Sequence, residues 1–301
     1  MIRFINLLLI LAIMSNTQAQ TKNDDMQSSK IIADGAKLQL ISNQFKFTEG
    51  PATDKDGNVF FTDQPNNKIW EYDTNGNLSL FLDNAGRSNG MCFDNEGNLI
   101  SCADEHNQLW SISPEKKITV LVKEVDGLHL NGPNDVFVTP DDKIYFSDPY
   151  YQRDYWTRKA PEIKGQKVYY LDKNKHVSVV IDDLKKPNGI IGTPDGKYLY
   201  VADIEGNKTY KYSIAEDGTL KEPKLFVAKG SDGMTIDNEG NIYLTGKGVT
   251  VYNSDGKQIE HIDIDADWTG NVTFGGKEKN ILFITASQNI YTLKMKVKGV
   301  R

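Results

Sequence analysis

The sequence has few of the residues and runs that mark several common classes of protein. It has only two cysteines, Cys92 and Cys102, and they form no Cys-x-x-Cys pair, so zinc or redox chemistry on cysteine is not indicated. One Gly-x-Ser-x-Gly segment occurs, Gly86-Arg87-Ser88-Asn89-Gly90, but no helical pattern follows it, so nothing supports a serine nucleophile on an elbow turn. No cluster of lysine and arginine occurs either, and the net charge is −6. We therefore expect neither nucleic acid nor a membrane surface as a partner.

Long apolar runs are also scarce, and the one at the N-terminus is short. Arg3 is the only charged residue among residues 1–19, an apolar run covers residues 7–14, and the stretch ends at the small residue Ala19. This pattern predicts a secretory signal peptide cut near Ala19, which is too short for a stable membrane span. Residues 20–30 are polar and predict a flexible leader. We therefore expect an exported protein, periplasmic or secreted.

The two cysteines lie on either side of a predicted turn at residues 94–97, which places them on neighbouring strands of one hairpin. An exporting compartment allows a disulfide, whereas buried thiols are the commoner outcome when the register is unknown. The sequence leaves both states open.

A repeated strand opening is the main signal in the rest of the chain. Six times a short apolar strand begins with Glu, Asn or Asp, at spacings of 40, 45, 54, 44 and 39 residues. A period of this length indicates a propeller or a solenoid. The six openings are Glu49-Gly50-Pro51, Asn89-Gly90-Met91, Asn134-Asp135-Val136, Asn188-Gly189-Ile190, Asp232-Gly233-Met234 and Asn271-Val272-Thr273.

Each opening leads through a turn of the Asp-x-x-Gly type to a second strand and then to a third strand marked by an aromatic residue. Hairpin turns of this kind need the positive φ that glycine supplies. Six repeats of about four strands, with almost no helical periodicity, predict an all-β, six-bladed β-propeller over residues 31–301. Residues 37–41 are expected to add the outer strand that closes the last blade. The aromatic markers are Trp70, Trp110, Tyr169, Tyr210, Tyr252 and Tyr291.

The connectivity of such blades predicts where the functional side chains gather. The strand openings share one face of the propeller with the loops that follow each second strand. These loops include residues 104–107 and the longest insertion, residues 148–167, and the loop at residues 124–133 reaches the same face. We expect the chemistry on this face and plain turns on the other, because binding residues concentrate on loops held by a rigid scaffold.

If the openings surround an axis, their oxygen-bearing side chains form one ring. Carboxylate and amide oxygens without His or Cys are hard ligands, which favour Ca²⁺. Other divalent cations such as Mg²⁺, Mn²⁺ or Zn²⁺ remain alternatives, because the sequence does not define the cavity size. Any one of these residues, taken alone, is more often a turn residue than a ligand. Their repetition at the start of every blade favours ligand placement.

These motifs together resemble the SMP-30/gluconolactonase/luciferin-regenerating family of calcium-dependent six-bladed propellers. The resemblance covers essentially all of residues 40–295. The matching segments are Phe47-Thr48-Glu49-Gly50-Pro51, Ser88-Asn89-Gly90-Met91, Asn131-Gly132-Pro133-Asn134-Asp135, Phe146-Ser147-Asp148-Pro149, Pro187-Asn188-Gly189-Ile190 and Ser231-Asp232-Gly233-Met234.

The resemblance implies Glu49, Asn188 and Asp232 as metal ligands, with Asn134 as a fourth ligand or a substrate contact. It also matches Asp232 to the general base, a role for which Glu49 is the alternative. His106 matches a histidine of the family. The arginine pair that commonly follows that histidine in gluconolactonases is missing here, where the sequence reads His106-Asn107-Gln108-Leu109-Trp110.

The implied activity is metal-assisted hydrolysis of a lactone, most naturally a sugar lactone such as gluconolactone. The metal polarises the carbonyl and a water attacks it, with its proton taken by Asp232 or Glu49. Asn134, Asn89 and His106 are candidate substrate contacts. Tyr151 and Arg153 in the insertion join them as expected determinants of specificity. We expect a small-molecule substrate and a monomer or weak homo-oligomer.

Two other functions are compatible with the same residues. An oxygen-ligated metal that faces water also suits hydrolysis of an organophosphate. A propeller that binds a sugar or another ligand without turnover is the alternative from a different class. A pure scaffold would not need two carboxylates at its axis. Metal-dependent turnover of a lactone distinguishes an enzyme from a binding module.

Overall fold

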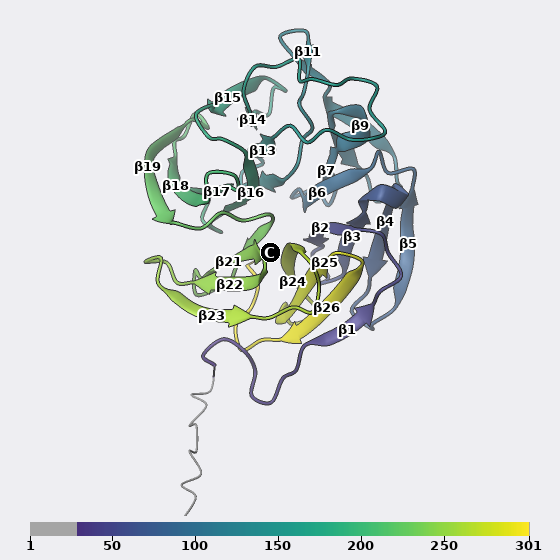
Figure 1. Ribbon diagram of the computed structural model, residues 1–301, viewed down its shortest axis with the longest axis vertical. Coiled ribbons are helices and arrows are strands. Elements are labelled where there is room, and N and C mark those ends of the chain that lie inside the picture. The colour runs from purple at the N-terminus through teal and green to yellow at the C-terminus, as the bar shows by residue number, and fades with distance from the viewer. Residues whose placement is uncertain (1–28, 301) are drawn as a thin grey trace, which may run out of the picture.

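Six blades of antiparallel β-strands surround a central axis in the computed structural model, which describes residues 29–300 (Figure 1). The prediction of a six-bladed β-propeller is confirmed. The predicted signal peptide lies outside the described residues, as does the leader up to residue 28. No helix within residues 29–300 is long and apolar enough to cross a membrane.

Blades 1 to 4 are separate four-stranded sheets, each running in chain order from the axis outward. Their strands are β2 (Thr48–Thr53), β3 (Val59–Asp63), β4 (Lys68–Tyr72) and β5 (Leu78–Asp83); β6 (Ser88–Phe93), β7 (Leu99–Ala103), β8 (Gln108–Ile112) and β9 (Ile118–Val122); β12 (Val136–Val138), β13 (Ile144–Asp148), β14 (Lys167–Leu171) and β15 (Val177–Ile181); β16 (Pro187–Gly192), β17 (Tyr198–Asp203), β18 (Lys208–Ile214) and β19 (Leu220–Val227).

Blades 5 and 6 form one larger sheet, because Gly246 at the end of β21 pairs with Thr269 at the start of β24. Blade 5 contains β20 (Met234–Ile236), β21 (Ile242–Gly246), β22 (Gly248–Tyr252) and β23 (Gln258–Ile262), and blade 6 contains β24 (Thr269–Gly275), β25 (Ile281–Ala286) and β26 (Asn289–Lys294). The outer strand of blade 6 is β1 (Gln39–Ser42), which pairs with β26. The expected closure of the ring by an N-terminal strand is therefore confirmed, and it joins the two ends of the propeller.

Three short elements interrupt this plan. The 3-10 helices η1 (Gln64–Asn66) and η2 (Asp104–His106) directly follow the second strands of blades 1 and 2. A two-stranded hairpin, β10 (Glu124–Val125) and β11 (Leu128–His129), lies in the connection from blade 2 to blade 3. All three lie in connections on the face where second strands end, so they add side chains to one face only.

The hydrophobic core lies between neighbouring blades, because a single sheet cannot bury both of its faces. One buried cluster joins Ile100 of blade 2 to Val136 and Phe146 of blade 3. In every blade except blade 5, the aromatic residue predicted on the third strand lies opposite the middle of the second strand, as in the pair Phe146 and Tyr169. In blade 5, Tyr252 lies opposite Ile242, the first residue of β21. The aromatic rings fill the space between sheets, which explains why an aromatic recurs on the third strand of each repeat.

Three aspartates at the ends of second strands fasten the segments that precede the strand openings. Each carboxylate accepts hydrogen bonds from two successive backbone N–H groups located two or three residues before an opening. The bonds run from Lys46 and Phe47 to Asp63 at 3.1 and 3.3 Å, from Asn131 and Gly132 to Asp148 at 2.9 and 2.8 Å, and from Lys185 and Lys186 to Asp203 at 3.0 and 2.9 Å. The openings that begin at Glu49, Asn134 and Asn188 are therefore fixed to their own blades.

Replacing Asp203 with Ala should lower the free energy of unfolding by about 1–3 kcal/mol, because three backbone N–H groups, those of Lys185, Lys186 and Gly206, lose a charged acceptor. Chemical denaturation followed by tryptophan fluorescence measures the change. Asp182→Ala is the matched control, since Asp182 is exposed, and should change stability by less than about 0.5 kcal/mol. Equal effects of the two variants would contradict the fastening role.

In the described part of the chain, Cys92 and Cys102 form no disulfide. Cys92 lies opposite Ile100 in the hairpin, and its thiol donates a hydrogen bond to the carbonyl of Phe93 at 3.6 Å. Cys102 is completely buried, and burial raises the pKa of its thiol well above the ordinary value. A thiol that is both inaccessible and protonated is a poor nucleophile.

Cys102 should therefore resist alkylation in the native protein and react after unfolding. Peptide mass spectrometry after iodoacetamide treatment, with and without denaturant, measures this directly. A mass shift of two hydrogens on reduction, or rapid labelling of Cys102 at neutral pH, would show that the thiol is not in the state described.

Candidate functional site

The first strands of all six blades lie next to one another around the axis (Figure 1). We call the face where these strands begin the mouth face, and the face where they end the turn face. The insertion at residues 148–167 follows a second strand and so belongs to the mouth face. A hydrogen bond from Asn188 Nδ2 to the hydroxyl of Tyr151, at 3.1 Å, joins a strand opening to this insertion.

Strand pairing defines which residues stand at the same level around the axis. Thr48 pairs with Asp63 and Thr269 pairs with Ala286 at matching places in blades 1 and 6, so Gly270 is the counterpart of Glu49. The residues at this level, the axial ring, are Glu49, Asn89, Asn134, Asn188, Asp232 and Gly270.

The expectation that Asn271 is the sixth member of the ring is wrong by one residue. Asn271 and Asp135 instead occupy the next position, where the other four blades have glycine. Each uses its side-chain oxygen to accept a hydrogen bond from the following backbone N–H, Val272 at 2.8 Å and Val136 at 3.0 Å. The sequence alone did not reveal this shift, because Asp135-Val136 and Asn271-Val272 both have the local pattern of a strand opening. Blade 6 therefore contributes no side chain to the ring itself.

Close approach between blades explains the glycines that follow the ring residues. A Cβ atom on Gly90 would lie 2.3 Å from Asp135 Oδ1, and one on Gly189 would lie 2.1 Å from the carbonyl oxygen of Asp232. Both distances are well inside van der Waals contact. A backbone hydrogen bond from Gly90 to the carbonyl of Asn134, at 2.7 Å, uses this closeness. The glycines thus let each ring residue pack directly on the next blade.

The two carboxylates of the ring are held in different ways. Glu49 is buried, its Oε2 accepts a hydrogen bond from Gly50 N at 2.9 Å, and Asn271 also donates to it. Burial, followed by the negative charges of Asp232 and Asp135, raises the pKa of Glu49 well above its usual range, against the hydrogen bonds, which lower it. An uncompensated excess of negative charge therefore faces the axis.

Asp232 is half-buried and accepts a hydrogen bond from the indole N–H of Trp268 at 2.6 Å. Burial raises the pKa of Asp232 to about 6, while hydrogen bonds from Trp268 and Asn188 and the charge of Arg153 oppose the rise. Asp232 thus keeps a pKa near neutrality, which suits a group that accepts a proton. Trp268 lies two residues before Gly270, and this position is the only sequence signal that could have identified it as a site residue.

Asp135 is a third carboxylate at this level, and sequence reasoning did not select it as a site residue. It is buried, and its Oδ2 accepts a hydrogen bond from Ile190 N at 3.2 Å across the blade boundary. Burial raises the pKa of Asp135 to about 8, although hydrogen bonds from Ile190 and Val136 lower it. Asp135 therefore both bridges blades 3 and 4 and adds acidity beneath the ring.

The chemistry of these donors fits a hard divalent cation. Asn89 and Asn134 are buried as residues, but their amide atoms are not enclosed, and within residues 29–300 neither amide makes a hydrogen bond. Accessible amides with no protein partner are free to bind a ligand in the axis. The described residues include no group of three or more His, Cys, Asp or Glu side chains placed to hold a metal ion, so amide oxygens would be needed beside the two carboxylates.

The structure brings some predicted substrate contacts to this ring and leaves one outside. Tyr151 contacts Asn188, and burial, with the charge of Asp232, raises the pKa of its hydroxyl to about 12. The guanidinium of Arg153 lies over the Tyr151 ring at 5.5 Å. His106, in contrast, is exposed and stacks on Trp110 with ring centroids 5.5 Å apart. It makes no contact with the ring residues.

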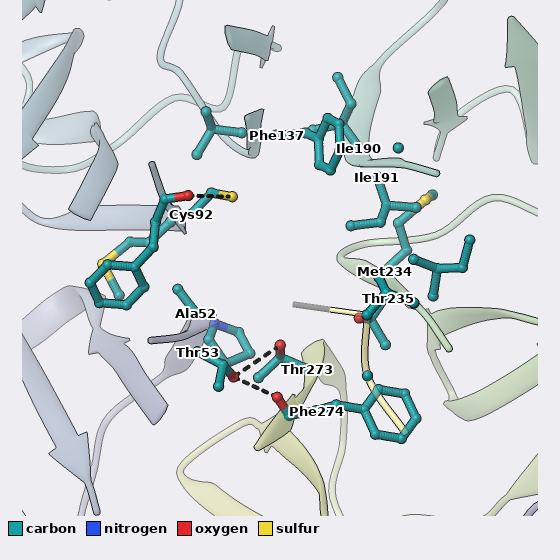
Figure 2. A pocket seen from close by; sticks show the side chains of 18 of the residues that line it. Ala52, Thr53, Cys92, Phe137, Ile190, Ile191, Met234, Thr235, Thr273 and Phe274 are labelled. Carbon is teal, nitrogen blue, oxygen red and sulfur yellow. Dashed lines mark hydrogen bonds between the residues drawn. The ribbon is translucent and has the colours of Figure 1, made fainter. Parts of the chain in front are cut away.

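A cavity of about 470 Å³ lies on the axis on the turn side of the ring. Figure 2 shows side chains of several blades around it, including Ala52, Cys92, Phe137, Ile190 and Met234. The expectation of plain turns on this face is therefore incomplete. Its walls are mainly apolar, with Asp135 and Asn271 at the end nearest the ring. The polar chemistry remains on the mouth side.

The fold and the ring define a class of protein: a propeller in which successive blades place carboxylates and amides around the axis. Comparison with known proteins assigns the chain to a family of that class. It matches the family described as SMP-30/Gluconolactonase/LRE-like region over residues 9–123 and 47–288. The chain belongs to this family.

Individual relatives agree with this placement. A gluconolactonase of Zymomonas mobilis is 26% identical over 293 residues, which cover 87% of this chain and 82% of the relative. The solved structure of a gluconolactonase from Xanthomonas campestris is 26% identical, has a TM-score of 0.81 and aligns with 88% of this chain and 91% of its own. Regucalcin of Agrobacterium tumefaciens, at 19% identity and a TM-score of 0.74, shares the fold; the match covers 88% of this chain and 95% of regucalcin.

Replacing Trp268 with Phe should raise the pKa of Asp232 above about 6 in chelator-treated protein, because the indole hydrogen bond stabilises the charged carboxylate. Carbon NMR titration of labelled aspartate measures the shift. Trp70→Phe is the matched control, since the Trp70 indole N–H has no hydrogen-bond partner in the structure. An unchanged Asp232 pKa in Trp268→Phe would show that the bond does not control its protonation.

Proposed function

We propose that this protein is a metal-dependent hydrolase that opens a sugar lactone. The observation that carries the proposal is the axial ring, in which Glu49 and Asp232 face the same space as accessible amides that have no protein partner. The similarity to gluconolactonases over most of the chain supports the choice of a lactone as the substrate. Ser88, in the segment Gly86-Arg87-Ser88-Asn89-Gly90, is buried, and its hydroxyl donates to the carbonyl of Ala85 and accepts from Ser101, which agrees with hydrolysis by water rather than by a serine nucleophile.

The ring residues that would hold the cation are Glu49, Asn134, Asn188 and Asp232, and Ca²⁺ suits their oxygens best. Such a cation supplies Lewis acidity, which polarises the ester carbonyl and offsets the charge that develops on its oxygen. Two carboxylates balance its charge, and the amides add neutral oxygens. The described residues place no positively charged group between Glu49 and Asp232, so the charge of Asp232 helps to raise the pKa of Glu49. A bound cation would offset this repulsion.

The proton chemistry is assigned to Asp232. Its pKa near 6 leaves it mostly ionised at neutral pH, so it can accept a proton from an attacking water. Trp268 holds one carboxylate oxygen, Oδ2, and thereby directs the other toward the axis. Glu49 is more deeply buried and is bonded by both Gly50 and Asn271, which suits a ligand better than a base.

The remaining groups at the mouth are assigned to the substrate. Asn89 and Asn134 can each donate and accept a hydrogen bond, which orients a lactone ring over the axial ring. Tyr151 restricts the mouth from the side of blade 4 through its contact with Asn188. Because these side chains exclude water, every electrostatic interaction in the site becomes stronger.

The test is hydrolysis of a lactone panel, with a phosphotriester in parallel, before and after chelator treatment. We expect turnover of glucono-δ-lactone that chelator abolishes and Ca²⁺ restores, with one divalent ion per chain by elemental analysis. Glu49→Ala and Asp232→Ala should lose the ion and melt at lower temperature, because a ligand bound only by the folded state stabilises it.

Asp232→Asn separates the two assigned roles of this residue. It should lower kcat by about a hundredfold or more, the usual contribution of a positioned acid or base, with less effect on metal content. Asp154→Asn, which neutralises an exposed carboxylate on the insertion, is the control and should turn over normally. Turnover of the phosphotriester alone would assign an organophosphate hydrolase instead. Chelator-sensitive ligand binding without turnover would assign a binding protein.

A further inference from the structure

One buried carboxylate, that of Asp104 at the start of η2, joins the insertion over the mouth to blades 1 and 2. The Asp104 side chain is only 2% exposed. Its Oδ2 accepts hydrogen bonds from Gln64 Nε2 at 3.1 Å, Arg153 Nε at 2.7 Å and the Tyr155 hydroxyl at 2.5 Å, and its backbone carbonyl accepts one from Trp156 Nε1 at 3.0 Å. One residue of blade 2 therefore gathers blade 1 and three side chains of the insertion.

Burying a carboxylate is unfavourable unless a positive charge and hydrogen bonds compensate it. Burial raises the pKa of Asp104, and the charge of Arg153 and the bond from Tyr155 act against that rise. Arg153 supplies that positive charge, and Gln64 and Tyr155 supply neutral donors to the same carboxylate.

The way in which Arg153 is bound leaves most of its hydrogen-bond donors unused by the ion pair. Asp104 takes only the Nε–H of the guanidinium, whose fork carries five N–H donors in one plane. Within residues 29–300 no side chain or carbonyl accepts a hydrogen bond from either Nη group. The Arg153 side chain is 24% exposed, and its charge acts on Asp232 of the axial ring. Four donors are thus fixed at the mouth and left without partners.

We propose that Asp104 is a positioning residue that directs the Nη groups of Arg153 at the substrate, and that the site therefore selects lactones bearing several hydroxyl groups. This inference rests on the proposed function. A rigid, planar set of donors matches two neighbouring hydroxyl oxygens on one ring. A neutral substrate fits better than an anionic one, because Asp104 already balances the charge of Arg153 while Glu49 and Asp232 face the same space.

The experiment compares two lactones that differ in hydroxyl groups. Glucono-δ-lactone carries several, and δ-valerolactone has the same ester ring without them. In Asp104→Asn and in Arg153→Gln, kcat/KM for gluconolactone should fall by about tenfold to a hundredfold, mainly through KM, as expected for lost hydrogen bonds to a charged group. For δ-valerolactone, measured well above the pKa of Asp232 so that this base stays ionised without the charge of Arg153, both variants should stay within about twofold of the wild type, since no interaction with hydroxyls exists to lose.

The double variant tests whether the two residues act as one unit. Asp104→Asn with Arg153→Gln should lose no more than Arg153→Gln alone on gluconolactone, because a positioning residue has no effect once its target is absent. Glu162→Gln is the matched control. Glu162 lies on the same insertion and accepts a hydrogen bond from His129 N at 2.9 Å, but it is exposed and away from Arg153. It should leave both activities unchanged.

Several outcomes would overturn the inference. Equal losses on both lactones would mean that Asp104 only stabilises the insertion. Additive losses in the double variant would mean that the two residues act separately. A wild-type preference for a lactone carrying a carboxylate, lost in Arg153→Gln, would replace hydroxyl recognition with charge recognition. If Asp104→Asn does not fold, Arg153→Gln alone still decides between hydroxyl recognition and a structural role. Wild-type protein that hydrolyses neither lactone would overturn the proposed function as well.

Discussion

The close approach of the first strands around the axis is the constraint on which the rest of the structure depends. Where the backbone of one blade lies on the next, no Cβ fits, as at Gly50, whose added Cβ would be 1.9 Å from the carbonyl oxygen of Asn89. This contact brings the residue before each glycine to the axis. Side chains separated by 40 to 54 residues in blades 1 to 5 thereby share one small volume.

That volume concentrates negative charge. Glu49, Asp232 and Asp135 approach one another in a buried setting, and the aspartates that fasten the preceding segments prevent the openings from moving apart. A flexible site would relieve the repulsion by rotation or by opening. A propeller cannot, because each first strand is held on both sides by neighbouring blades. The fold therefore keeps these three carboxyl groups close together at the axis.

The mouth is organised by a different principle. The insertion has no strand pairing of its own between β13 and β14, so polar contacts define its path. Asp104 provides the main anchor, and Arg158 adds a second through hydrogen bonds to the carbonyls of Leu130 and Asn131. A rigid ring beneath a loop fixed by a few side chains allows the loop to vary while the ring residues stay constant.

The blade number, the closing strand and the placement of Glu49, Asn134, Asn188 and Asp232 at the starts of first strands could be read from the sequence, because strand and turn signals are local and repeat. The sixth ring position could not, since Asn271 has the local pattern of an opening and only the pairing of Thr269 with Ala286 shows that Gly270 stands there. Asp104, Asp135 and Trp268 were also beyond local reasoning. Their partners come from other blades or distant loops, so only tertiary packing decided which side chains face the axis.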